Sequence, residues 1–382
     1  MQYLPRTTRY FVISIVCLPL LFQYMTPLSG LTCGDFFLMV CGLFYVFSGR
    51  VKIEWKFALL IAYVIILTLS CLLNGSLMRI TTTIHYLAYL FIVMLMSNLV
   101  RYRGFCLKIY NKVCLVSAGL MVVQTIVLQI TGICIPGVLT FLPLTDEDMY
   151  NYADVVMSHN SGRCMSFFAE PSHFAVYVLP FLVFKLFLNN IVTRKDMVQA
   201  IFVSISLIMC ASFTGILSAS IVWGLFIVIS IMKGNISFKN ILLLIISAVS
   251  FFIVLMNSFG GEYLSNADIY ERQSEGRFAG FSLLDEVNIS DEALFFGAGM
   301  NDLGDIMYLP GWPRLLFYYG IVGSIIYILT LFSCTYRNTV SFLLLSLLGV
   351  LMVGTEVNFG CYFVLYMLCI YITKDIPLFS KH

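Results

Sequence analysis

The stretch MVQAIFVSISLIMCASFTGILSASIVWGLFIVISIM (residues 197–232) carries no charged side chain along its whole length. A helix needs about 20 apolar residues to cross the hydrocarbon core of a bilayer, so this stretch is too long for one ordinary crossing. It forms either one long helix or two short helices joined by a tight turn at Ser212-Phe213-Thr214-Gly215. The choice decides on which side of the membrane every later segment lies.

The composition of the whole chain places it in a membrane. Of its 382 residues, 60% are hydrophobic and 11% are charged, and the mean hydropathy is +0.95. A soluble fold of this size cannot keep so much apolar surface out of water. We therefore predict an all-α polytopic membrane protein with about twelve transmembrane helices in a single integral membrane domain, residues 1–382. The approximate limits of the predicted spans are residues 10–29, 30–48, 56–74, 80–99, 111–131, 166–188, 197–212, 215–232, 240–257, 314–334, 339–354 and 357–373.

The distribution of basic residues favours two helices within residues 197–232. With the N-terminus inside, 17 of the 22 Lys and Arg residues fall in cytoplasmic loops, as the positive-inside rule requires. One long helix would invert all later segments and spoil this pattern for Lys233, Lys239 and Arg337. We therefore predict a multi-pass protein with both termini in the cytoplasm and two larger external loops, about residues 132–165 and 258–313.

The cations left on the outer face are all arginines. The planar guanidinium group matches two phosphate oxygens at once, so a set of arginines without a lysine favours a phosphate or diphosphate ligand. In the alternative interpretation, the arginines pair with the surrounding acidic residues and hold the loops together. The set comprises Arg79, Arg163, Arg272, Arg277 and Arg314.

The segment SGRCMSFFAEPSHFAVYVLPFL (residues 161–182) places polar groups at the outer mouth of a predicted span. Pro171 lacks a backbone N–H and is tolerated in the first turn of a helix, so we predict a helix that starts near Glu170 or Pro171. His173 then lies on the same face as Glu170. Glu170 is a candidate general base, and Arg163 and the helix N-terminus can hold negative charge. Alternatively, Glu170 is only a helix cap and His173 bonds a neighbouring helix.

The segment also carries the series Gly162-Arg163-x-x-Ser166-Phe167-Phe168-x-Glu170-Pro171-Ser172-His173. Over residues 160 to 330, this chain resembles the Wzy-type O-antigen and capsular polysaccharide polymerases, which are related to the O-antigen ligase superfamily. The E-P-S-H motif is fairly specific, whereas the glycine motifs that accompany it are weak. Those later motifs are Ser212-x-Thr214-Gly215, Ser274-Glu275-Gly276-Arg277, Phe295-Phe296-Gly297-x-Gly299 and Gly320-x-x-Gly323.

The resemblance implies a GT-C-like glycosyltransferase architecture and an inverting, metal-independent reaction that needs no cofactor. Such enzymes join undecaprenyl-diphosphate-linked oligosaccharide repeat units on the periplasmic face of the bacterial cytoplasmic (inner) membrane. The implied partners are this lipid-linked oligosaccharide, membrane lipid and a chain-length regulator protein, with no nucleic acid. The resemblance implies Glu170 or His173 as the base and Arg163 and Arg277 at the diphosphate.

Substrate-binding roles are expected for a wider set of residues. Arg272 or Arg314 is expected to contact the diphosphate, and Ser172 belongs to the E-P-S-H motif. Asp35, Arg79 and His85 fall near the outer ends of their spans and are candidates to line a sugar cavity. Interfacial snorkelling or an internal ion pair explains these three equally well.

Several observations bear on the competing functions. O-antigen ligases use a histidine in the second large outer loop, and none of the four histidines lies between residues 258 and 313. A lipid-linked oligosaccharide flippase or other transporter should carry charges in a central cavity and show two similar halves, but these spans are nearly free of charge. The R-x10-G repeat of some polymerases is absent, which leaves the choice among the loop arginines open. Asp146-Glu147-Asp148 imitates a metal motif, although an acidic solvated loop explains it better.

Overall fold

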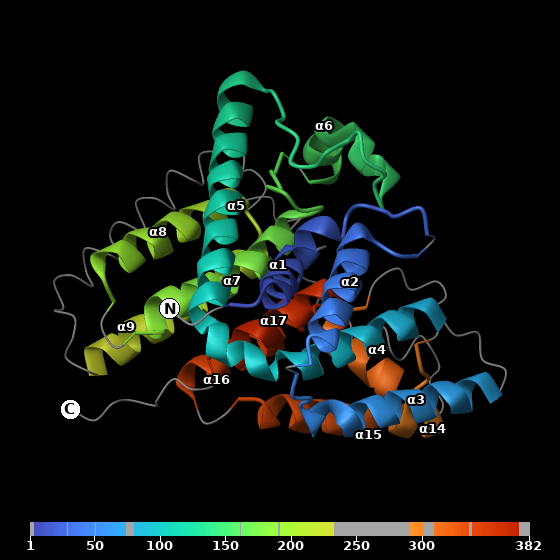
Figure 1. Ribbon diagram of the computed structural model, residues 1–382. Helices are drawn as coiled ribbons and strands as arrows, with labels where there is room; N and C mark the ends of the chain where they lie inside the picture. Colours follow the sequence, from blue (N-terminus) through green and yellow to red (C-terminus); the bar gives the residue numbers. More distant parts are fainter. Residues whose placement is uncertain are drawn as a thin grey trace. The chain divides into compact units, whose positions relative to one another are not determined.

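The computed structural model describes residues 4–28, 30–49, 51–73, 80–160, 162–189, 192–232, 291–300, 309–335 and 338–373. Within these residues the regular structure is helical (Figure 1). Tyr24 and Leu144 form an isolated β-bridge. The chain separates into two compact units. Unit 1 comprises Met1–Leu18, Leu28–Leu107 and Gln273–His382, and unit 2 comprises Pro19–Pro27 and Lys108–Arg272.

Unit 1 is built around the last helix of the chain. Every residue of α17 (Cys361–Ile372) is buried, as expected of a helix that is apolar on all sides. It packs against α16 (Thr339–Leu351), α4 (Ile80–Met94) and the 3₁₀ helix η2 (Leu95–Tyr102). The other helices of unit 1 are α1 (Arg6–Leu21), which runs on into unit 2, α2 (Cys33–Phe47), η1 (Trp55–Phe57), α3 (Ala58–Leu73), α14 (Asp291–Phe296) and α15 (Gly311–Ser333).

Helix α15 contains a break at Gly320, whose backbone lies in the left-handed region with φ 63°. The break leaves the carbonyls of Phe317 and Tyr318 available, and they accept hydrogen bonds from Ala298 and Gly299 at 2.9 and 3.0 Å. The motif at residues 295–299 therefore contacts the segment just before the Gly320-x-x-Gly323 motif in unit 1.

Unit 2 is built around α7 (Pro171–Phe187), which is buried over nearly its whole length. Helices α8 (Arg194–Met209) and α9 (Phe213–Met232) both pack against it. The remaining helices of unit 2 are α5 (Arg103–Thr131), which begins in unit 1, η3 (Glu147–Asn151), α6 (Tyr152–Asp154) and η4 (Val155–His159).

The apolar stretch at residues 197–232 forms two helices, as predicted. The chain turns between α8 and α9 at Ala211, which adopts a left-handed φ of 47°. The side chain of Ser212 accepts a hydrogen bond from the backbone N–H of Gly215 at 3.4 Å, at the start of α9. A helix N-terminus gains from such a cap because its first N–H groups have no partner within the helix.

The all-helical membrane class is supported, whereas the number of crossings stays a prediction. Every predicted span that falls within the described ranges coincides with a helix, although α1 already ends at Leu21. The predicted span at residues 240–257 and most of the second external loop lie outside these ranges. Within the described ranges, four helical segments are long and apolar enough to cross a membrane: Trp55–Leu73, Ile80–Thr131, Phe213–Met232 and Gly311–Ser333.

Candidate functional site

The candidate site lies at the start of α7 in unit 2, where the sequence predicted a helix to begin. Pro171 is the first helical residue and Glu170 is the N-cap, with an extended backbone (φ −142°, ψ 155°). The Glu170 side chain makes no capping bond to the helix, and its carboxylate is exposed and accepts a hydrogen bond from the Ser172 hydroxyl at 2.8 Å. Glu170 therefore holds the cap position while its carboxylate stays open to a reactant.

His173 follows in the same helical turn and is half-buried, as is Ser172. An electrostatic interaction links His173 to Glu170. The placement of both side chains on one face of the helix stays a prediction.

Arg163 precedes this group and is oriented by backbone carbonyls. Its Nε donates to the carbonyl of Asn160 at 2.9 Å, and one terminal nitrogen donates to the carbonyl of Ala211 at 3.5 Å. Carbonyl acceptors are neutral, so these two bonds direct the guanidinium without cancelling its charge.

The α8–α9 turn (Cys210–Ser212) contacts both parts of the candidate site. Ala211 receives the bond from Arg163, and the thiol of Cys210 lies 3.9 Å from the carbonyl oxygen of Pro171. All three turn residues are buried. The turn therefore lies close to both Arg163 and the start of α7.

The segment between Arg163 and Glu170 is anchored on both sides. The ring of Phe168 is buried and packs against Tyr177 at a centroid distance of 5.1 Å. The amide of Gln23 donates to the carbonyl of Phe167 at 2.7 Å, and the amide of Gln124 contacts the backbone of Ser166. Gln23 and Gln124 were not among the predicted site residues. A glutamine within an apolar span was the available signal, since polar groups at membrane depth are costly.

Comparison of the chain with protein-family models, curated proteins and solved structures finds no match. The assignment of a function therefore rests on the chemistry of the residues themselves.

Three predicted substrate-binding residues, Asp35, His85 and Arg314, lie in the described part of unit 1. Asp35 is fully buried, and one carboxylate oxygen accepts from the Tyr89 hydroxyl at 2.5 Å while the other accepts from the Thr32 hydroxyl at 2.7 Å. Thr32 and Asp35 form a capping box at the start of α2, which accounts for the carboxylate as a structural group. His85 is half-buried in α4.

Arg314 forms an ion pair with Glu356 and donates from Nε to the carbonyl of Leu309 at 3.1 Å. This is the internal pairing that the sequence left open as an alternative to ligand binding. The remaining predicted residues, Arg79, Arg272 and Arg277, lie outside the described ranges.

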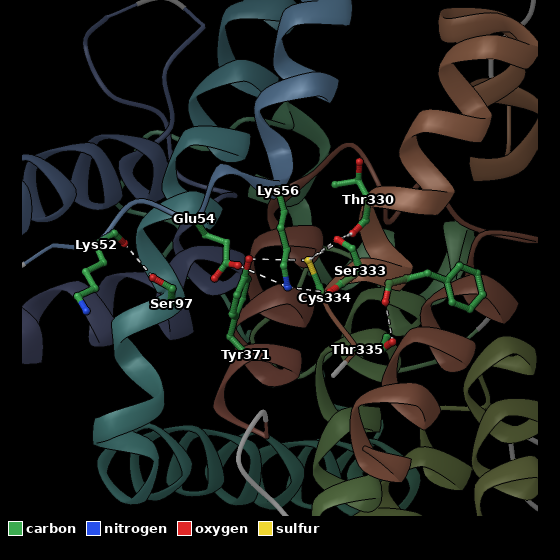
Figure 2. A network of polar contacts seen from close by, with 10 residues as sticks. Lys52, Glu54, Lys56, Ser97, Thr330, Ser333, Cys334, Thr335 and Tyr371 are labelled. Atoms are coloured by element: carbon green, nitrogen blue, oxygen red, sulfur yellow. Dashed lines mark hydrogen bonds and ion pairs between the residues drawn. The ribbon is translucent and has the colours of Figure 1, made fainter. Parts of the chain in front are cut away.

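A further polar cluster in unit 1 joins η1 to the end of α15 (Figure 2). The ammonium group of Lys56 donates to the carbonyl of Ser333 at 2.7 Å and lies 3.4 Å from a carboxylate oxygen of Glu54. The last carbonyls of a helix lack partners within it and favour a nearby cation. This cluster is therefore a structural junction between helices.

The acidic run at residues 146–148 has a local structural role. Asp146 is the N-cap of η3 and accepts a hydrogen bond from the backbone N–H of Asp148 at 3.0 Å. Within the described part of the chain, no group of three or more His, Cys, Asp or Glu side chains is arranged to hold a metal ion.

Proposed function

We propose that the chain is a polysaccharide polymerase that joins undecaprenyl-diphosphate-linked oligosaccharide repeat units by inverting, metal-independent glycosyl transfer. The observation that carries this proposal is the shared contact of Arg163 and the start of α7 with the α8–α9 turn. It supports a site that combines an exposed carboxylate with an oriented guanidinium. Such a pair supplies the two functions that the reaction needs.

The first function is that of a general base. The acceptor sugar hydroxyl attacks the anomeric carbon of the donor, and its proton passes to the Glu170 carboxylate, with His173 as the alternative base. An exposed carboxylate that makes no capping bond can approach such a hydroxyl. As the new glycosidic bond forms, the bond from the anomeric carbon to the diphosphate oxygen breaks with inversion.

The second function is stabilisation of the leaving group. Undecaprenyl diphosphate departs with additional negative charge, which oriented cations and backbone N–H groups stabilise when no divalent cation takes part. Arg163 provides the cation, and the N-terminus of α7 adds N–H groups and a favourable helix dipole. In this proposal Arg277 is the second diphosphate ligand, and Arg272 is an additional contact, both on the strength of the sequence motif.

The setting of the reaction follows from the charge distribution of the sequence. The start of α7 belongs to the side that carries few basic residues, which in a bacterial inner membrane is the periplasmic side. There the polymerase would meet its lipid-linked substrate and a chain-length regulator protein.

Deletion of the gene, followed by gel analysis of the surface polysaccharide, tests this proposal. A polymerase deletion leaves lipid A core capped with a single repeat, and the wild-type gene restores the ladder. Long chains that remain on the undecaprenyl carrier without attachment would instead assign the chain as a ligase. Single repeats trapped in the cytoplasmic leaflet would assign it as a flippase.

A further inference from the structure

Gln124 in α5 is fully buried. Its side-chain amide contacts both the backbone N–H and the backbone carbonyl of Ser166. Its Oε1 accepts from the N–H of Ser166 at 2.8 Å, and its Nε2 lies 3.4 Å from the carbonyl oxygen of the same residue. The same Nε2 donates to the carbonyl of Ile135 at 3.0 Å and reaches the hydroxyl of Tyr152 at 3.2 Å. One side chain thus ties three parts of the segment between α5 and α7 to α5.

The residue that Gln124 holds has an unfavourable backbone conformation. Ser166 has a φ of 55°, in the left-handed region that costs a side-chain-bearing residue free energy. Its hydroxyl donates to the carbonyl of Ser117 at 2.7 Å, which adds a second tether to α5. Gly137 lies so close that a Cβ atom there would overlap the Ser166 carbonyl oxygen. The surroundings therefore force Ser166 into this conformation.

Ser166 lies between the two groups that the proposed reaction uses. Arg163 precedes it by three residues and Glu170 follows it by four. A change in the backbone angles at Ser166 would shift Arg163 relative to Glu170, and small misplacements of reacting groups cost large factors in rate.

We propose that Gln124 is a positioning residue of the polymerase, which holds Ser166 in its left-handed conformation and thereby sets the placement of Arg163 relative to Glu170. The catalytic consequence of this inference rests on the proposed function. The contact by which Gln124 holds Ser166 can be tested without any enzymatic assay. Gln124 acts through the main chain of the segment and does not touch the reacting atoms.

Cys164 provides the assay that is independent of activity. It lies two residues before Ser166 and is 3% exposed. Burial raises the pKa of its thiol to about 11, so the native side chain is both shielded and protonated at neutral pH. Because only the thiolate reacts readily, Cys164 should label slowly with a maleimide unless the segment is released.

The test variant is Gln124→Met, which keeps the length of the side chain and removes its hydrogen bonds. Gln199→Met is the matched control, because Gln199 lies in α8 and its side-chain oxygen has no hydrogen-bond partner among the described residues. Each purified full-length protein is treated with N-ethylmaleimide at pH 7, and labelling of Cys164 is followed by mass spectrometry. Extension is measured with undecaprenyl-diphosphate-linked repeat units extracted from the deletion strain.

We expect Gln124→Met to label at Cys164 about tenfold faster than the wild type, and its kcat to fall about 10- to 100-fold while KM changes less than about threefold. Gln199→Met should match the wild type in both assays. Should Gln124→Met be recovered unfolded, Gly137→Ala displaces the Ser166 carbonyl from the other side and should produce the same paired change.

The positioning role would be overturned by lost extension with Cys164 still shielded, or by full extension with Cys164 exposed. Full extension with Cys164 still shielded in both variants would also overturn it. If the wild type itself does not extend the repeat units while Gln124→Met still exposes Cys164, the structural role of Gln124 is supported and the proposed function is wrong.

Discussion

The backbone of Gly320 lies directly against the backbone of Gly297, so that a Cβ atom on Gly320 would lie 2.5 Å from the Gly297 nitrogen. Both glycines have left-handed backbone angles, with φ of 63° and 92°. Next to this contact, the backbone N–H of Ala298 donates a hydrogen bond to the carbonyl of Phe317, just before the break in α15. The two glycine motifs, which are weak signals separately, form one structural feature.

Replacement of Gly320 by alanine should therefore destabilise unit 1. An alanine must adopt an unfavourable φ and also displace neighbouring backbone, which together cost about 2–4 kcal/mol. Thermal unfolding of the purified protein in detergent should show a clearly lower midpoint. Gly360→Ala is the control, because Gly360 has a φ of −113° and open space around its Cβ position. Equal midpoints for the two variants would contradict the close contact.

The approach of α9 to α7 supplies a second prediction. A Cβ atom on Gly215 would lie 2.6 Å from the Cβ of Ala175, whereas Gly224 in the same helix has open space. Gly215→Leu should cost about 1–3 kcal/mol through overpacking. It should also reduce chain extension, because the α8–α9 turn that contacts Arg163 must move with the helix.

Gly224→Leu should leave both the unfolding midpoint and the polysaccharide ladder unchanged. A normal ladder and midpoint in Gly215→Leu would mean that α7 and α9 are not packed as closely as described.

The ion pair between Lys185 and Asp196, with a separation of 2.9 Å, predicts a pH dependence of stability. Burial raises the pKa of Asp196, but hydrogen bonds from Thr193 and Lys185 outweigh it, so the pKa lies below its ordinary value of 3.8. A carboxyl group whose pKa is lower in the folded state stabilises the fold above its unfolded pKa and loses this contribution as the pH falls through the folded pKa.

Asp196→Asn should therefore be less stable than the wild type by about 1 kcal/mol at pH 7, with a difference that shrinks below pH 4. Unfolding midpoints measured between pH 3 and pH 7 check this. Asp148→Asn, which changes an exposed acid in η3, should show no such trend. A constant difference between Asp196→Asn and the wild type across this range would rule out the ionic origin.

Local features of the fold were predictable from the sequence. The missing N–H of Pro171 placed the start of α7 correctly, and the charge distribution around residues 197–232 correctly required two helices. Both rest on rules that act within a few residues or count charges along the chain. The first span was predicted to extend to residue 29, but α1 ends at Leu21. Tyr24 instead pairs with Leu144, a distant contact that no local sequence pattern indicates.

The connections within the site were less predictable. The sequence suggested Arg163 and Glu170 but gave no sign that Ala211 would accept a hydrogen bond from the arginine. Gln124 was not predicted as a site residue because its partner Ser166 is 42 positions away in the sequence. For Arg314 the sequence allowed both a ligand contact and an ion pair. The structure contains the ion pair with Glu356.

In the proposed reaction, Glu170 and Arg163 together carry out glycosyl transfer from a lipid diphosphate. Its most direct test is extension of undecaprenyl-diphosphate-linked repeat units by the purified protein in the presence of EDTA, with Glu170→Gln and Arg163→Ala beside the wild type and Glu147→Gln as an exposed acidic control. We predict a ladder of products from the wild type and Glu147→Gln, and at least a 100-fold loss of extension in both site variants, as expected when a general base or a charge-stabilising group is removed. A full ladder from folded Glu170→Gln, or no extension by the wild type until a divalent cation is added, would contradict the account.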